Sequence, residues 1–235
     1  MSIEDLQPED LEALRRYDTP TICNAIEMIM PELYGIGFTN RPLVPAHPSL
    51  PPFVGFARTA MMRAASAPAR SIEERRKLRF GYVDYIYNGR RPTVMVVQDI
   101  DPVPGFGAWW GEVNSAVHKG LGCVAAVTNG SFRDVDLLAP GFQILGSHVG
   151  PAAAHVQIVD YDCEVNVCGM AVKTDDIIHG DRHGAVVVPA AAVKKIPAAV
   201  ELALRREKVI LDAARSPDFD AEKLKKAYQE AWAID

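Results

Sequence analysis

The chain has 235 residues, of which 49% are hydrophobic and 23% charged, and its formal net charge is −5. These values are ordinary for a globular protein that buries one generous core. The acidic balance and the absence of a block of lysines and arginines argue against a nucleic-acid-binding surface, so we expect no nucleic-acid partner.

Two further class assignments follow from the sequence. No stretch approaches the roughly 18 apolar residues of a membrane span, and the acidic residues 1–5 are unlike a signal peptide, so we predict a cytoplasmic protein with no membrane partner. The cysteines form no CxxC pair, which favours reduced, buried thiols over zinc ligands or disulfides. They are Cys23, Cys123, Cys163 and Cys168.

The first part of the chain predicts two helices, an extended connection and a strand. Residues 8–16 have a helical period, and Asp18 and Thr19 are N-cap candidates for a second helix that ends at Pro31. Alternation over residues 53–62 indicates a strand. The connection between them cannot be helical because it contains Pro42, Pro45, Pro48, Pro51 and Pro52.

The middle of the chain has the order strand, helix, strand. Residues 71–74 form a capping-box pattern that opens a helix ending near Asn88, and its charged run 73–79 is typical of a solvated helix face. Apolar runs at 93–97 and 123–127 predict buried strands, separated by a loop over 99–111 and a helix over 112–119. This order implies two parallel strands joined by a right-handed crossover.

The last part predicts further strands and then helices. From Ala190 the pattern is helical, with interruptions at Pro197 and Pro217. We therefore predict an α/β fold of the swivelling β/α/β type, with a central mixed sheet and N-terminal helices. Residues 1–190 form a single α/β catalytic domain, and residues 191–235 form a C-terminal helical arm that packs on the same or a neighbouring subunit. The further strands are predicted at 143–145, 158–160, 164–167, 170–172 and 185–188.

The candidate chemistry lies at two strand ends. Glu112 opens the helix after strand 93–97, and Arg133-Asp134 follows strand 123–127, with twenty residues between Glu112 and Arg133. In an open α/β sheet, ligands bind beyond the carboxyl ends of the strands. We therefore expect two acids and one guanidinium to share a crevice.

These groups suit a carboxylated substrate beside a divalent metal ion. The first turn of a helix has unpaired N–H groups at a positive dipole end, so the amides of Val113 and Asn114 are candidate ligands of a carboxylate. Arg133 adds a planar pair of donors for the same anion. Asp134 supplies the oxygen ligand that Mg²⁺ and Mn²⁺ prefer.

A structural account of the same residues stays open. Glu112 in a first helical turn complements the helix dipole, and Arg133 and Asp134 fit a surface ion pair. The spacing alone slightly favours this account over a catalytic one.

Three stretches together resemble the regulator of ribonuclease activity A family. The first contains Trp110-Gly111-Glu112, Gly120-Leu121-Gly122, Asn129-Gly130 and Arg133-Asp134; the second is 180–189, and the third is 18–25. They span roughly residues 18–190. This family includes the class II pyruvate aldolases that act on 4-hydroxy-4-methyl-2-oxoglutarate and 4-carboxy-4-hydroxy-2-oxoadipate.

The resemblance implies a role for each site residue. The family's enzymes carry an acid, twenty intervening positions and then Arg-Asp, a set that its non-enzymatic regulators lack and this chain completes. Asp134 is then expected to bind Mg²⁺ or Mn²⁺ directly, Glu112 to hold a metal-bound water, and Arg133 to pair with the substrate. The backbone of Gly111, Val113 and Asn114 is expected to bind the pyruvyl carboxylate.

The resemblance also implies an assembly. A C-terminal glutamate of a neighbouring subunit completes the metal site in such aldolases, and Glu207 is the candidate here, with Glu201 behind it. We expect a homo-oligomer, either a trimer or a hexamer. Two departures from the family pattern stand out: Asn129 occupies a position where Asp is frequent, and Glu112 is one methylene longer than Asp.

The leading hypothesis is a divalent-metal-dependent lyase. It cleaves a 4-hydroxy-2-oxo acid and releases pyruvate through a metal-stabilised enolate, with oxaloacetate decarboxylation as a side activity. Two alternatives stay open: a non-catalytic protein that binds and regulates a ribonuclease, and a related decarboxylase or lyase that acts on a substrate other than an aldol.

Overall fold

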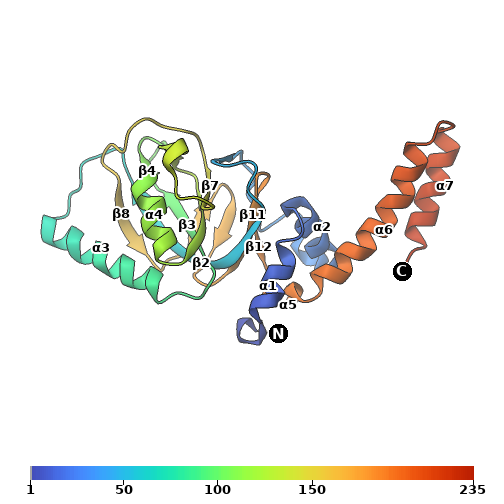
Figure 1. Ribbon diagram of the computed structural model, residues 1–235, viewed down its shortest axis with the longest axis horizontal. Helices are drawn as coiled ribbons and strands as arrows, with labels where there is room; N and C mark the ends of the chain where they lie inside the picture. Colours follow the sequence, from blue (N-terminus) through green and yellow to red (C-terminus); the bar gives the residue numbers. More distant parts are fainter. Residues whose placement is uncertain (1) are drawn as a thin grey trace.

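The computed structural model describes residues 2–235 and has a curled mixed sheet at its centre (Figure 1). The strands of this sheet are β1 (Val44–Pro45), β2 (Phe53–Arg63), β3 (Thr93–Asp99), β5 (Cys123–Thr128), β7 (Gln143–Gly146), β8 (Gln157–Tyr161), β11 (Ile177–Asp181) and β12 (Gly184–Val188). Their spatial order is β1, β7, β5, β3, β2, β11, β12, and β8 pairs with the carboxyl end of the long strand β2.

The centre of the sheet is parallel, as the strand–helix–strand order predicts. β2 pairs with β3, β3 with β5, and β5 with β7, all in parallel. β1, β8, β11 and β12 add antiparallel neighbours. The predicted α/β fold with a central mixed sheet is confirmed, although β11 has no counterpart among the predicted strands.

Two short strand pairs lie outside this sheet. β9 (Val165–Val167) and β10 (Met170–Val172) form an antiparallel hairpin, whereas β4 (Ala108–Trp110) pairs in parallel with β6 (Ser131–Phe132). The prediction of a loop over residues 99–111 is therefore wrong for residues 108–110, which form β4. The β4–β6 pair matters because each of its strands leads directly into a predicted site residue.

Two of the helices, α2 and α3, begin at predicted caps. Asp18 accepts a hydrogen bond from Thr21 N at 2.9 Å, and Ser71 and Glu74 form the predicted capping box. The helices are α1 (Pro8–Leu14), α2 (Thr19–Ile29), α3 (Ile72–Tyr87), α4 (Glu112–Gly120), α5 (Ala190–Val193), α6 (Ile196–Ala214) and α7 (Ala221–Trp232), with single 3₁₀ turns at Ile3–Asp5, Pro31–Leu33 and Val135–Leu137.

Both faces of the sheet are buried. Side chains alternate along β3, so Met95 and Val97 join the core on the α3 side, while Val94 and Val96 join the core beside β9 and β10. A third core connects α1, α2 and the start of α6 to β11 and β12. The N-terminal and C-terminal helices therefore cover the same end of the sheet.

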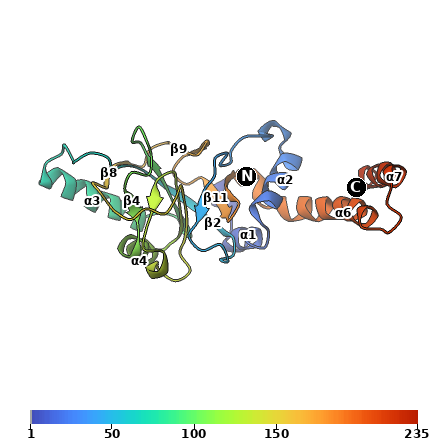
Figure 2. The same ribbon diagram turned by 90° about the horizontal axis from the view of Figure 1, so that it is seen from above.

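The C-terminal arm extends from this third core. The start of α6 is anchored by the buried residues Ile196 and Val200 beside α2, and the rest of α6 pairs with α7 away from the sheet in both views (Figures 1 and 2). Pro197 lies in the first turn of α6, and Pro217 separates α6 from α7, as predicted. No helix within residues 2–235 combines the length and apolarity that crossing a bilayer requires.

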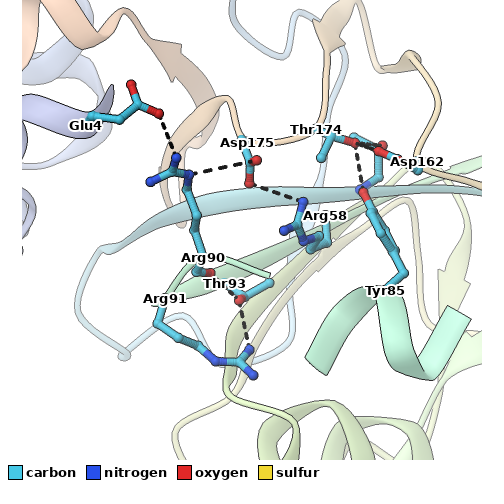
Figure 3. Close-up of polar contacts among 10 residues, drawn as sticks. Glu4, Arg58, Tyr85, Arg90, Arg91, Thr93, Asp162, Thr174 and Asp175 are labelled. Carbon is cyan, nitrogen blue, oxygen red and sulfur yellow. Dashed lines mark hydrogen bonds and ion pairs between the residues drawn. The ribbon is translucent and has the colours of Figure 1, made fainter. Parts of the chain in front are cut away.

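A polar network joins β2, α3 and two turns (Figure 3). Arg58 of β2 is 8% exposed, and its Nη1 lies 3.1 Å from Asp175 Oδ1 in an ion pair without hydrogen-bond alignment. Its guanidinium also lies 4.8 Å from the centre of the Tyr85 ring. Arg90 approaches Asp175 to 3.9 Å and pairs with the exposed Glu4 at 2.8 Å.

Candidate active site

The fold brings Glu112, Arg133 and Asp134 to one place. Trp110 pairs with Phe132 in the β4–β6 ladder, and Arg133 N donates to Trp110 O at 2.9 Å. Immediately beyond, Glu112 N donates to Asp134 Oδ2 at 3.2 Å, and Arg133 Nε lies 3.5 Å from the same oxygen. The meeting point is therefore the end of the small β4–β6 pair, rather than the ends of β3 and β5 themselves.

Gly111 allows this close approach. A Cβ atom at position 111 would lie 2.5 Å from Asp134 Oδ2 and 3.2 Å from Arg133 Cγ, both closer than van der Waals contact permits. Asp134 itself has a φ of 54°, a left-handed conformation that aspartate tolerates better than most residues. The turn is thus shaped to hold the carboxylate of Asp134 against the start of α4.

The first turn of α4 presents backbone donors. Its N-cap is Gly111, which has no side chain to satisfy them, and Glu112 N is already used by Asp134. The amides of Val113 and Asn114 lack intrahelical acceptors at this position. Glu112 and Val113 are exposed, so an anion from solvent can reach the turn.

Buried side chains fix α4 against its neighbours. Asn114 Nδ2 donates to Trp109 O at 2.5 Å, and the His118 ring bonds to Asn114 O at 2.6 Å and to the Tyr82 hydroxyl at 2.8 Å. Burial lowers the pKa of His118 to about 4, so the ring is neutral; Nδ1 donates to the carbonyl and Nε2 accepts from Tyr82. This chain of bonds keeps the first turn of α4 in position.

Asn129 and Asp99 organise the loop before β4. Asn129 Oδ1 accepts from Asp99 N at 2.7 Å, and its Nδ2 donates to Asp99 O at 2.9 Å. The Asp99 carboxylate in turn accepts from Asp101 N and Gly105 N at 3.0 and 2.7 Å. Burial raises the pKa of Asp99 despite these bonds. The sequence did not reveal this network, because side-chain bonds to distant backbone leave no spacing signature.

The donor set at Asp134 fits a largely hydrated divalent ion. Within the described chain, no group of three or more His, Cys, Asp or Glu residues could enclose a metal ion. The Asp134 side chain is about one-third exposed. Its hydrogen bond from Glu112 N and its ion pair with Arg133 both use Oδ2, and neither uses Oδ1. Mg²⁺ keeps several waters and binds through one or two carboxylates, so a single partly exposed carboxylate such as that of Asp134 matches the kind of protein ligand that this ion takes.

The C-terminal glutamates lie elsewhere in the single chain. Glu201 and Glu207 are exposed on α6, which extends away from α4 in both views (Figures 1 and 2). One chain therefore does not bring Glu207 to Asp134. The contribution of Glu207 from a neighbouring subunit stays a prediction.

The other two motif stretches meet each other. Asp181, in the β11–β12 hairpin, accepts from Thr19 N at 2.9 Å, and Thr19 Oγ1 lies 3.1 Å from His179 Nδ1. His183 bonds to Asp181 Oδ1 through its backbone N and its ring. Burial lowers the pKa of His179 to about 4. These contacts join α2 to the β11–β12 hairpin. They give Thr19, His179 and Asp181 a structural role in holding the two elements together.

A large groove of the described surface lies away from these residues. It has a volume of about 670 Å³ and runs between α1 and the starts of β2 and β5, with Leu11, Phe53 and Phe142 in its walls. Its lining is mainly apolar and includes neither the α4 turn nor Arg133 and Asp134. The candidate active site is therefore defined by its converging donors and not by the size of a cavity.

Comparisons with known proteins agree with this fold. Residues 10–187 match the profile of the RraA-like family, described as Aldolase/RraA. No curated protein matches the chain. A solved structure of an uncharacterized protein from Pseudomonas syringae pv. tomato str. DC3000 is 18% identical over 98% of this chain and 97% of its own, with a TM-score of 0.71.

Two other solved structures are similar. A protein described among novel cellulases from microbes associated with the gut ecosystem is 20% identical over 88% of this chain and 89% of its own, with a TM-score of 0.70. RraAS2 of Streptomyces coelicolor, described as an unusual member of the RNase ES inhibitor RraA protein family, is 21% identical over 90% of this chain and 98% of its own, with a TM-score of 0.66. At these identities the similarity shows a shared fold.

Proposed function

We propose, from the premise that the chain belongs to the RraA-like (Aldolase/RraA) family, that it is a lyase that cleaves a 4-hydroxy-2-oxo acid and releases pyruvate. The observation that carries this proposal is the convergence of Arg133, Asp134 and the first turn of α4. Glu112 N and Arg133 Nε lie 3.2 and 3.5 Å from one Asp134 oxygen. A family regulator that only binds another protein has no need of this arrangement.

Binding of the substrate carboxylate is the first task of these residues. The guanidinium of Arg133 is partly exposed and pairs with a carboxylate through two N–H groups. The amides of Val113 and Asn114 add donors at the positive end of the α4 dipole. Together they orient a 2-oxo acid with its carbonyl towards Asp134.

Proton transfer is the second task, and we assign it to Glu112. In the proposed cleavage, the 4-hydroxyl loses its proton, the C3–C4 bond breaks, C4 becomes a carbonyl, and C3 receives a proton to give pyruvate. Glu112 is exposed and has no ion-pair partner in residues 2–235, so its carboxylate is free to exchange these protons through a water molecule. Oxaloacetate yields the same enolate on decarboxylation and is a proposed side substrate.

A divalent cation is part of the proposal. Asp134 would hold Mg²⁺ or Mn²⁺, with Glu112 contributing through water. When bound, such an ion supplies positive charge that polarises the 2-oxo group and offsets the charge of the developing enolate.

The surroundings of the site support a homo-oligomer. Val113 and Val117 on α4 and Leu137 just after Asp134 are all exposed apolar side chains. Exposed apolar side chains that gather in one place are typical of a surface that another subunit covers. We propose a trimer or hexamer in which Glu207 comes from a neighbouring subunit, and light scattering after size-exclusion chromatography measures the assembly.

Pyruvate release tests the proposed activity. The substrates are 4-hydroxy-2-oxo acids and oxaloacetate, each with and without Mg²⁺ or Mn²⁺. Arg133→Ala and Asp134→Ala should each lower kcat/KM by about 100-fold or more, because each removes a charge that acts on the transition state. Asp136→Ala is the matched control, since Asp136 is exposed two residues beyond the site and should keep near-normal turnover.

The outcomes separate the alternatives. Near-normal rates in either site variant would contradict the assignment of the site. No pyruvate from any substrate with either metal would contradict the aldolase proposal. Tight binding of a ribonuclease without such turnover would instead favour the regulatory alternative. Pyruvate and CO₂ from oxaloacetate, with no pyruvate from any 4-hydroxy-2-oxo acid, would favour the decarboxylase.

A further inference from the structure

A second groove lies between the first half of α3 and β8. It has a volume of about 270 Å³ and is lined at its base by Trp109 of β4. α3 and β8 lie side by side at one edge of the molecule (Figures 1 and 2). The volume is just below the roughly 300–1,000 Å³ of pockets that hold drug-sized ligands, so the groove suits a smaller molecule. Its lining includes none of Glu112, Arg133 and Asp134.

Three arginines of α3 line this groove. Arg75, Arg76 and Arg79 are exposed, and none of them forms an ion pair within the part of the chain that the structure describes. The carboxylate of Glu74 on the same helix is used in the capping box with Ser71. These three guanidiniums and Lys77 outnumber the carboxylates of Glu73 and Glu74 on the same turns of α3, so the depression has a local excess of positive charge, which favours an anionic ligand.

Trp109 adds an aromatic ring to the lining of the groove. Trp109 is 5% exposed, and its indole Nε1 has no hydrogen-bond partner in residues 2–235. The Arg79 guanidinium lies 5.8 Å from the centre of the indole ring, within cation–π range. The indole therefore gives the groove an aromatic surface and a cation–π partner for Arg79.

The walls between the arginines and Trp109 are apolar. Ile72 and Leu78 contribute from α3, and Val156 and Ile158 from β8 and the residue before it. An inorganic anion would leave these walls without contacts, whereas a hydrocarbon body would bury them. We propose that the groove is a binding site for a small organic carboxylate with an apolar body, whose carboxylate pairs with Arg79 and its neighbours on α3.

Binding of benzoate tests this site. In calorimetric titrations of the full chain at low ionic strength, benzoate should bind saturably. Arg79→Ala should weaken binding by roughly tenfold or more, since a charge-assisted hydrogen bond contributes on that scale. Trp109→Phe replaces the indole with a smaller ring that attracts the Arg79 guanidinium less, and it should weaken binding several-fold.

The controls define what contradicts the proposal. Lys77→Ala changes a cation of the same helix that does not line the groove, and it should leave binding within about twofold of the native chain. Benzamide, which lacks the charge, and sulfate, which lacks the apolar body, should each bind at least roughly tenfold more weakly. The proposal is overturned if benzoate does not saturate, if Arg79→Ala binds normally, or if Arg133→Ala removes binding instead. It is also overturned if Arg79→Ala alters the oligomeric state without affecting benzoate.

Discussion

Asn129 holds the backbone of Asp99 at two points, as acceptor and as donor. An aspartate has only acceptors when it is ionised, so it could replace one of these bonds but not the other. Asparagine at position 129, where the family frequently has aspartate, therefore suits the two bonds that hold the loop after Asp99. That loop leads into β4, and β4 leads into Gly111 and the α4 turn.

Asn129→Asp should consequently destabilise the protein. The Asp99 carbonyl would lose its donor in a partly buried setting, which costs on the order of 1–3 kcal/mol of the free energy of unfolding. Urea denaturation measures the change. Asn88→Asp is the matched control: Asn88 also donates to a backbone carbonyl, but it is exposed, so water replaces the bond. Equal stability of Asn129→Asp and the native chain would contradict the account.

The sequence reveals some residues of the candidate site and not others. The spacing of Glu112, Arg133 and Asp134 is visible in the sequence, because charged side chains at helix and strand ends have positional rules. The support from His118 and Asn129 is not visible, because each bonds to a partner far along the chain. His118 bonds to the Tyr82 hydroxyl, and Asn129 bonds to the backbone of Asp99. Sequence reasoning therefore finds the reacting groups and misses the residues that position them.

At the scale of elements, the Arg58–Asp175 pair ties β2 to the turn before β11. The Arg58 side chain is 10% exposed and that of Asp175 is 33% exposed, so most of the guanidinium is removed from water. Asp175 has a φ of 68°, which asparagine also tolerates. A buried cation that loses its partner is destabilising even where the intact pair contributes little.

Asp175→Asn should lower the free energy of unfolding by about 2 kcal/mol, less than for a fully buried pair because Asp175 keeps some solvent contact. Glu4→Gln breaks the neighbouring pair with Arg90, in which both side chains are more than a third exposed, and should lower the free energy of unfolding far less, because solvent screens the pair. Both pairs appear in Figure 3. Urea midpoints compare the two variants. A larger loss in Glu4→Gln than in Asp175→Asn would refute this ranking.

The elements that the sequence did not predict share a cause. β11 contains His179 and Asp181, polar residues that resemble a turn, yet both are buried because Thr19 and the backbone before α2 satisfy them. β4 and β6 are too short for a period, and their ladder exists only once α4 and the main sheet are in place. Tertiary partners decide these strands, whereas β3, β5 and α3 follow from local pattern alone.

At the scale of the whole molecule, two buried histidines are parts of separate cores. His118 lies between α4 and α3, and His179 lies between β11 and the N-terminal helices. Burial lowers the pKa of each from an ordinary 6.5 to about 4. Both rings are therefore neutral in the folded chain at a pH where they are charged in the unfolded chain.

Stability should fall as the pH drops from 7.5 to 5. Between pH 6.5 and about 4, both histidines are protonated in the unfolded chain but neutral in the folded chain. This difference lowers the free energy of unfolding by about 2 kcal/mol per histidine at pH 5. Burial raises the pKa of Asp99 and of Asp176, an effect of opposite sign that acts nearer the usual carboxyl range.

Urea midpoints at pH 7.5, 6 and 5, at one protein concentration, test this expectation. Glutamine at position 118 can donate to Asn114 O and accept from Tyr82 without titrating, so His118→Gln should remove about half of the pH dependence. His179→Gln should remove the other part, and the exposed His155→Gln should change nothing. A native midpoint that is constant over this range would show that neither ring is held neutral by its core. A full slope retained in both His118→Gln and His179→Gln would place the titrating groups elsewhere.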